Sequence, residues 1–213
     1  MDKKYINELE NTVKQMLSPL KDLPFRVIIK SISGFLVLPF QKKKKIIKLF
    51  EKSFDNAAKE INKKGIKSNR PNEVGNYIEP FIKESLNKVG LKADTPIDKN
   101  GKKKSMGYPD IEILFNNHHY YLEVKTYNIK NINTTQRAFY FSPSANSKIT
   151  KNAPHLLISY QIEKGANGSY YAKHWRLYSL ENLKVDLKHE FNQSNRKLYG
   201  DKSDLDLILE KKI

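Results

Sequence analysis

The first part of the chain carries apolar residues at the spacing of amphipathic helices. One stripe predicts a helix over residues 5–18, just before Pro19, and a longer stripe predicts a second helix that Gly65 ends. Between them, residues 25–40 favour two short strands around a turn at Ser33-Gly34. The first stripe comprises Ile6, Leu9, Val13 and Leu17, and the second comprises Ile46, Ile47, Phe50, Phe54, Ala57, Ala58 and Ile61.

A third helical pattern occupies residues 72–89 and stops at Gly90. Pro80 lies within it, and a proline inside a helix removes one hydrogen bond and costs about 3 kcal/mol. The pattern therefore predicts either a kinked helix or a helix that begins near Asn76, with Pro80 in its first turn.

The second half of the chain reads mainly as strands. A hairpin is expected over residues 108–127, with its turn at Asn116-Asn117. Further strands are expected at residues 138–141, 155–162 and 170–178, and a last helix at residues 180–191. From residue 72 onward, this order predicts an α/β fold with a mixed central β-sheet flanked by helices.

The length of 213 residues fits a single domain over residues 1–213. Residues 66–213 would form the core, and residues 1–65 would form a mainly helical N-terminal elaboration. The longest apolar run, Gly34 to Phe40, is too short to cross a bilayer, and the N-terminus lacks the apolar segment of a signal peptide. A cytoplasmic protein with no membrane partner is expected.

Composition narrows the chemistry. The chain has no cysteine, which excludes disulfides and cysteine zinc sites. Its net charge of +16 comes from 39 basic and 23 acidic side chains, and such a balance favours polyanion partners. Lysine greatly outnumbers arginine, however, and an AT-rich coding sequence would give the same bias. Charge alone thus leaves nucleic-acid binding an open alternative.

Candidate catalytic residues lie on the predicted hairpin. Asp110 precedes its first strand, and Glu123-Val124-Lys125 lies inside its second. Residues two apart in a strand share a face, so Glu123 and Lys125 point the same way and Val124 points to the opposite face. Pairing of the two strands would bring Asp110 close to them. Two carboxylates and an ammonium can hold a hard divalent cation and a water beside a phosphodiester.

Two motifs resemble those of known nucleases. Pro109-Asp110, twelve intervening residues and Glu123-Val124-Lys125 resemble the PD-(D/E)xK motif of restriction-endonuclease-like nucleases. The run RPNEVGNYIE, from Arg70 to Glu79, resembles a helix of some type II restriction enzymes that puts a glutamate beside the active site. Together the two resemblances cover residues 70–127.

The resemblance implies a type II restriction endonuclease that cleaves double-stranded DNA with Mg²⁺ and leaves 5′-phosphate ends. Asp110, Glu123 and the Val124 carbonyl would hold the metal, Lys125 would orient the attacking water or stabilise developing charge, and Glu79 would assist. We expect a homodimer, because cutting both strands of a palindrome needs two sites related by a twofold axis. A cognate DNA methyltransferase is expected as well, since the host needs protection.

Other interpretations remain open. Asp110 could cap a turn, Glu123 and Lys125 could form a surface charge ladder, and Glu79 could pair with Lys83 or form a capping box with Asn76. Glu112 is a reserve carboxylate on the face of Asp110. A repair nuclease or junction resolvase of the same fold, or a noncatalytic basic nucleic-acid-binding protein, would fit the same pattern.

Polar residues near the hairpin are candidates for contacts with DNA, through base edges or phosphates. An ordinary surface loop would have the same composition. The candidates are Arg137, Ser142, Asn146, Ser147, Lys148, Lys102, Lys103 and Lys104.

Overall fold

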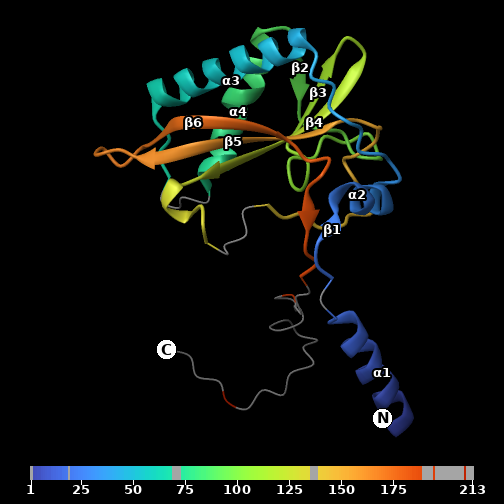
Figure 1. Ribbon diagram of the computed structural model, residues 1–213. Coiled ribbons are helices and arrows are strands. Elements are labelled where there is room, and N and C mark those ends of the chain that lie inside the picture. The colour runs from blue at the N-terminus through green and yellow to red at the C-terminus, as the bar shows by residue number, and fades with distance from the viewer. Residues whose placement is uncertain are drawn as a thin grey trace. The chain divides into compact units, whose positions relative to one another are not determined.

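The computed structural model describes residues 2–18, 20–68, 73–134, 139–188, 194 and 209, and it divides into two compact units (Figure 1). The first unit comprises Met1–Asp22 and Asp186–Ile213. Its helix α1 (Lys3–Met16) confirms the first predicted helix. The Asp2 carboxylate caps α1 by accepting a hydrogen bond from the Lys4 N–H at 3.1 Å. No residue of α1 is buried.

The second unit, Leu23–Val185, contains a five-stranded sheet in the order β2-β3-β4-β5-β6. Strands β4 and β5 run parallel, and the other neighbours are antiparallel, so the sheet is mixed, as predicted. The strands are β2 (Lys92–Asp94), β3 (Ile111–Phe115), β4 (His118–Tyr127), β5 (His155–Lys164) and β6 (Tyr170–Ser179). The 3₁₀ turn η2 (Ile129–Asn131) follows β4, and β1 (Leu23–Pro24) pairs separately with β7 (Lys184–Val185).

Helices cover both faces of this sheet (Figure 1). Helices α3 (Lys44–Lys64) and α4 (Val74–Lys88) bury their apolar stripes against one face, where Leu122 and Val124 of β4 lie. Helix α2 (Phe25–Ser33) packs on the opposite face, where Tyr121 lies. Because alternate residues of β4 point to opposite faces, Glu123 and Lys125 share the face of Tyr121.

The helix ends follow from local chemistry. Helix α3 matches the second predicted helix and ends at Gly65, whose φ of 66° favours glycine. Helix α4 begins at Val74 and contains Pro80, so it starts two residues before Asn76. No part of the described chain forms a helix long and apolar enough to cross a membrane.

The predicted hairpin is confirmed as β3 and β4. Ile111 pairs with Leu122, and Phe115 pairs with His118 at the turn. Asn116 and Asn117 both have positive φ, 47° and 62°, as a two-residue type I′ turn requires. The hairpin register therefore fixes Asp110 as the residue opposite Glu123, just beyond the last strand pair.

The predictions for three segments were wrong. The segment after residue 25 forms helix α2, which buries Phe25 and Ile29 at helical spacing. Gly34, with φ 84°, ends this helix; it does not turn a hairpin. Residues 180–188 form no helix, because Leu180 donates its N–H to the His155 carbonyl and β7 pairs with β1. Residues 139–141 form no strand, and residues 138 and 189–191 lie outside the described residues.

Candidate active site

The site begins where strand β3 ends. Its last pair is Ile111 with Leu122, and Pro109 has no N–H to continue the ladder. The Val124 N–H instead donates to Asp110 Oδ2 at 2.8 Å. The N–H and C=O of one strand residue point toward the same neighbouring strand. The Val124 carbonyl therefore faces the same gap as the Asp110 carboxylate.

Glu123 lies beside this gap and is buried, with 3% of its surface exposed. Its Oε1 accepts a hydrogen bond from Lys125 Nζ at 2.5 Å, which joins the two side chains on one face of β4. Its Oε2 is buried and has no hydrogen-bond partner in the described part of the chain. A buried carboxylate oxygen without a partner is costly and calls for a ligand.

The carboxylates also disturb each other electrostatically. Burial, and after it the charge of Asp110, raise the pKa of Glu123 to about 7. Lys125 and Lys148 act in the opposite direction and lower this pKa. A cation between the two carboxylates would offset both the burial and the repulsion.

The free oxygen atoms suit a hard cation. Asp110 Oδ2 and Glu123 Oε1 each already accept a hydrogen bond. The second oxygen of each carboxylate can therefore bind a metal, and the Val124 carbonyl can be a third ligand. No cluster of three or more His, Cys, Asp or Glu side chains suited to a metal occurs among the described residues. A metal here would complete its shell with water, as Mg²⁺ commonly does. These residues thus fit a divalent ion of that kind.

The remaining acidic candidates lie in different surroundings. Glu79 of α4 pairs with Lys83 at 3.0 Å, which is the i+4 alternative considered for it, and it also interacts electrostatically with Lys148. The capping box is wrong, because Asn76 lies inside α4 and Glu73 occupies the N-cap. Glu112 accepts from Lys151 at 3.0 Å and contacts His119 at 2.8 Å. It is therefore engaged away from Asp110.

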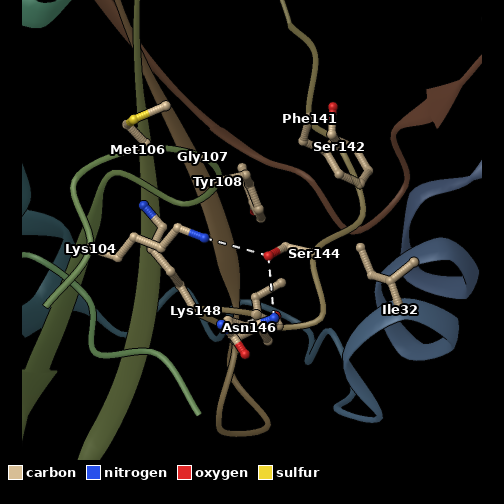
Figure 2. A pocket seen from close by; sticks show the side chains of 12 residues that line it. Ile32, Lys104, Met106, Gly107, Tyr108, Phe141, Ser142, Ser144, Asn146 and Lys148 are labelled. Carbon is tan, nitrogen blue, oxygen red and sulfur yellow. Dashed lines mark hydrogen bonds between the residues drawn. The ribbon is translucent and has the colours of Figure 1, made fainter. Parts of the chain in front are cut away.

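Most candidate DNA contacts line one small pocket of about 40 Å³ (Figure 2). It lies between the loop that precedes Asp110 and the polar loop after residue 140. Lys103 instead pairs with Asp94 at 2.5 Å, Lys102 is exposed, and Arg137 lies outside the described residues. The pocket is lined by Ser142, Ser144, Asn146, Ser147, Lys148 and Lys104, together with Ile32, Met106, Gly107, Tyr108, Phe141 and Ile149.

Sequence reasoning missed a polar pair at the wall of this pocket, formed by the buried His155 and the partly buried Tyr108. His155 Nδ1 lies 2.6 Å from the Tyr108 hydroxyl, and the two rings stack with centroids 5.7 Å apart. Burial lowers the pKa of His155 to about 3, so its ring is neutral near pH 7. Burial also raises the pKa of Tyr108, and the charges of Glu123 and Asp110 add to this. The only sequence signal was a histidine at the start of an apolar strand.

A mixed sheet that carries two carboxylates and a lysine at the end of a hairpin defines a restriction-endonuclease-like nuclease core. Residues 19–202 match the type II restriction enzyme MjaV family, and the chain belongs to that family. It is 41% identical over 230 residues to the Type II restriction enzyme MjaV of Methanocaldococcus jannaschii. The matched region covers 99% of this chain and 98% of that protein. The chain is accordingly a site-specific deoxyribonuclease, and its substrate is double-stranded DNA.

Proposed function

We propose that Asp110, Glu123 and the Val124 carbonyl bind Mg²⁺ and that this site hydrolyses the DNA phosphodiester to leave a 5′-phosphate. The observation that carries the proposal is the unpartnered, buried Oε2 of Glu123 beside Asp110. When bound, Mg²⁺ would make a water a better nucleophile at neutral pH and stabilise charge on the phosphate. The chain supplies the two acidic ligands at an end of the sheet where the backbone is fixed.

Lys125 has a separate role in this proposal. Its ammonium is held by Glu123 Oε1 and lies on the same face of β4. From that position it orients the attacking water or stabilises charge that develops on the scissile phosphate. The hydrogen bond to Glu123 restricts the Lys125 side chain to this position, so its ammonium is preorganised before DNA binds.

Glu79 is proposed to assist from helix α4. Its carboxylate is tied to Lys83 and interacts electrostatically with Lys148, which places negative charge near the pocket. It would hold a water of the metal shell or support a second metal. Its contribution is therefore smaller than that of Asp110 or Glu123.

The reaction also has consequences for assembly. Cleavage of both strands at a symmetric sequence is best served by a homodimer with two equivalent sites. The host would need a cognate DNA methyltransferase to protect its own sites. Because restriction acts on DNA that has entered the cell, the protein would work in the cytoplasm.

Plasmid digestion tests the proposed site. With Mg²⁺, the wild-type protein should give discrete fragments whose ends carry 5′-phosphates. Asp110→Asn, Glu123→Gln and Lys125→Ala should each lower the cleavage rate by a factor of about 100 or more and still bind DNA, because each removes a ligand or charge needed at the reacting phosphate. Normal cleavage by any one variant would remove that residue from the site.

Lys88→Gln is a suitable control for these variants. Lys88 pairs with Glu84 near the end of α4, and 56% of its side chain is exposed. Loss of this lysine should leave the cleavage rate unchanged. End mapping of the wild-type fragments on a sequenced plasmid would also identify the recognition sequence and cut position. Ragged or structure-dependent ends would contradict cleavage at a fixed sequence.

A further inference from the structure

Lys148 is a buried lysine that has no acidic partner among the residues the structure describes. Only 2% of its surface is exposed. Its Nζ contacts the Ser105 carbonyl at 3.5 Å, which is a long hydrogen bond. Within the described ranges, no Asp or Glu oxygen forms an ion pair with it. Lysine is rarely buried unless it is paired, so this ammonium lies in a place prepared for an anion.

The charges around Lys148 place it at the edge of the catalytic centre. Burial lowers the pKa of Lys148, and Asp110, Glu123 and Glu79 raise it from positions beyond ion-pair distance. Lys104 is near enough to lower the pKa further by repulsion. The ammonium groups of Lys104 and Lys148 therefore lie near each other where both line the pocket. Asp110 and Glu123 lie toward the proposed metal site. An anion between the cations would relieve their repulsion.

The walls of the pocket supply hydrogen-bond donors. Figure 2 shows Lys104 reaching from its loop to Ser144, with Nζ 3.4 Å from Oγ. The Ser144 hydroxyl also accepts from the Asn146 N–H, and the Ser147 hydroxyl accepts from the Ile149 N–H. These bonds shape the loop around the opening. The hydroxyl and amide groups that line it can donate to oxygen atoms of a ligand.

We propose that this pocket binds one backbone phosphate of the DNA beside the scissile phosphodiester, with Lys148 as its buried anchoring cation and Lys104 as its second cation. The inference rests on the proposed function, since it assumes that DNA lies across Asp110 and Glu123. A phosphate offers only acceptor oxygens and a full negative charge, which match two ammonium groups and a donor-rich wall. A base edge would leave at least one of the cations without a counter-charge.

The same geometry gives Lys148 a positioning role. It is attracted both to the bound phosphate and, at longer range, to the acidic residues of the metal site. The neighbouring phosphate would therefore be fixed relative to Asp110 and Glu123, and the scissile phosphate with it. Sequence alone could not separate Lys148 from the other lysines, because burial decides its role.

Binding measurements test the subsite without relying on cleavage. Affinity for a short duplex of arbitrary sequence is measured with Ca²⁺ at several salt concentrations for Lys148→Met and Lys104→Gln. Lys148→Met should bind about ten- to a hundredfold more weakly, as expected for a lost charge-assisted bond. The slope of log affinity against log salt should fall by about one for each variant. An unchanged slope in both would overturn the proposal.

Lys151→Met is the matched control on the same loop. Lys151 is already paired with Glu112, and its side chain is 46% exposed. The substitution removes one charge but should change affinity by less than about twofold, as expected for an exposed pair. A loss equal to that of Lys148→Met would show that only overall charge matters and would overturn the subsite.

A phosphate scan locates the contact. Duplexes that contain the mapped cleavage site carry one neutral methylphosphonate at successive backbone positions. For the wild-type protein, the methylphosphonate should weaken binding at one position next to the cut. For Lys148→Met, the substitution at that position should cause no additional loss of affinity, because the contact is already absent. Equal losses in wild type and variant at every position would exclude the contact. If thermal unfolding shows that Lys148→Met is unfolded, the same comparison with Lys104→Gln decides.

These readouts separate the two hypotheses. The metal-site proposal fails if Asp110→Asn, Glu123→Gln and Lys125→Ala all cleave plasmid DNA normally. The phosphate subsite fails on binding data alone, whatever the cleavage result. A protein that cleaves as expected but shows no Lys148-dependent phosphate contact would retain the first proposal and lose the second.

Discussion

At the scale of single residues, the carboxylates of the site differ in what holds them. Asp110 is fixed by a backbone N–H, Glu123 by the Lys125 ammonium, and Glu79 by Lys83. The first two therefore keep their positions through strand β4, whereas Glu79 depends on a partner on its own helix. This difference predicts a different response to substitution.

Glu79→Gln should lower the Mg²⁺-dependent cleavage rate by about tenfold, less than the variants of the proposed metal ligands, because the role proposed for Glu79 acts through a water. Lys83→Met is the matched control, since it breaks the same ion pair and leaves the Glu79 carboxylate in place. Plasmid cleavage rates of the two variants check the prediction. If both variants lose activity equally, the ion pair matters, and the carboxylate of Glu79 has no part in the reaction.

His155 should make stability depend on pH. Its folded-state pKa of about 3 lies below the ordinary value of 6.5, so the unfolded chain binds more protons between these values. Stability is therefore lost as pH falls from 6.5 toward 3, on the order of 3 kcal/mol by pH 4. Urea unfolding at several pH values measures this loss, which His155→Gln should reduce.

Tyr108→Phe is the control for His155. It removes the hydroxyl that contacts His155 Nδ1 but leaves the imidazole buried. This variant should be less stable at every pH and should keep the steep loss in acid. A Tyr108→Phe protein with a flat pH profile would show that the hydroxyl, and not burial of the ring, governs the effect.

At the scale of elements, the sequence predicted the helices and strands whose pattern of apolar residues is clear. Helices α1 and α3 follow helical apolar spacing, strands β3 to β6 are apolar or alternating runs, and the hairpin register brought Asp110 to Glu123. Helix α2 was missed because nine residues with a following glycine resemble a strand and a turn. The pocket at Lys148 was not predictable as a unit, since its irregular loop is placed by tertiary contacts.

The hairpin turn offers a test at this scale. Asn117 has φ 62°, which glycine adopts more easily than asparagine or alanine. Asn117→Gly should stabilise the protein by about 0.5 kcal/mol, whereas Asn117→Ala should destabilise it by about 1 kcal/mol. Urea unfolding with both variants measures the difference. Equal stability of the two would contradict a left-handed conformation at this position.

At the scale of the whole molecule, the net charge of +16 favours electrostatic attraction to the DNA backbone. The predicted single domain over residues 1–213 and the homodimer stay predictions. The apolar residues of α3 share one core with the sheet, so residues 44–64 fold with the strands that carry the site. Both the excess of lysine and the position of the pocket favour strong contacts with the DNA backbone.

Affinity for nonspecific duplex DNA should therefore fall steeply with salt. A protein that makes several phosphate contacts loses a factor of about 1,000 or more in affinity between 50 and 200 mM salt. Fluorescence anisotropy with a labelled duplex at increasing salt measures this slope. A nearly flat dependence would mean that the lysines are ordinary surface residues and that the chain contacts few phosphates.

The hydrogen bond from Val124 to Asp110 gives the site an internal reporter. A backbone amide that donates to a carboxylate has a resonance position sensitive to that oxygen's charge and orientation. Titration of divalent ions should thus move the Val124 amide signal in a nuclear magnetic resonance spectrum before distant amides respond. Occupancy of the catalytic centre could then be followed through the main chain, without a label and without DNA.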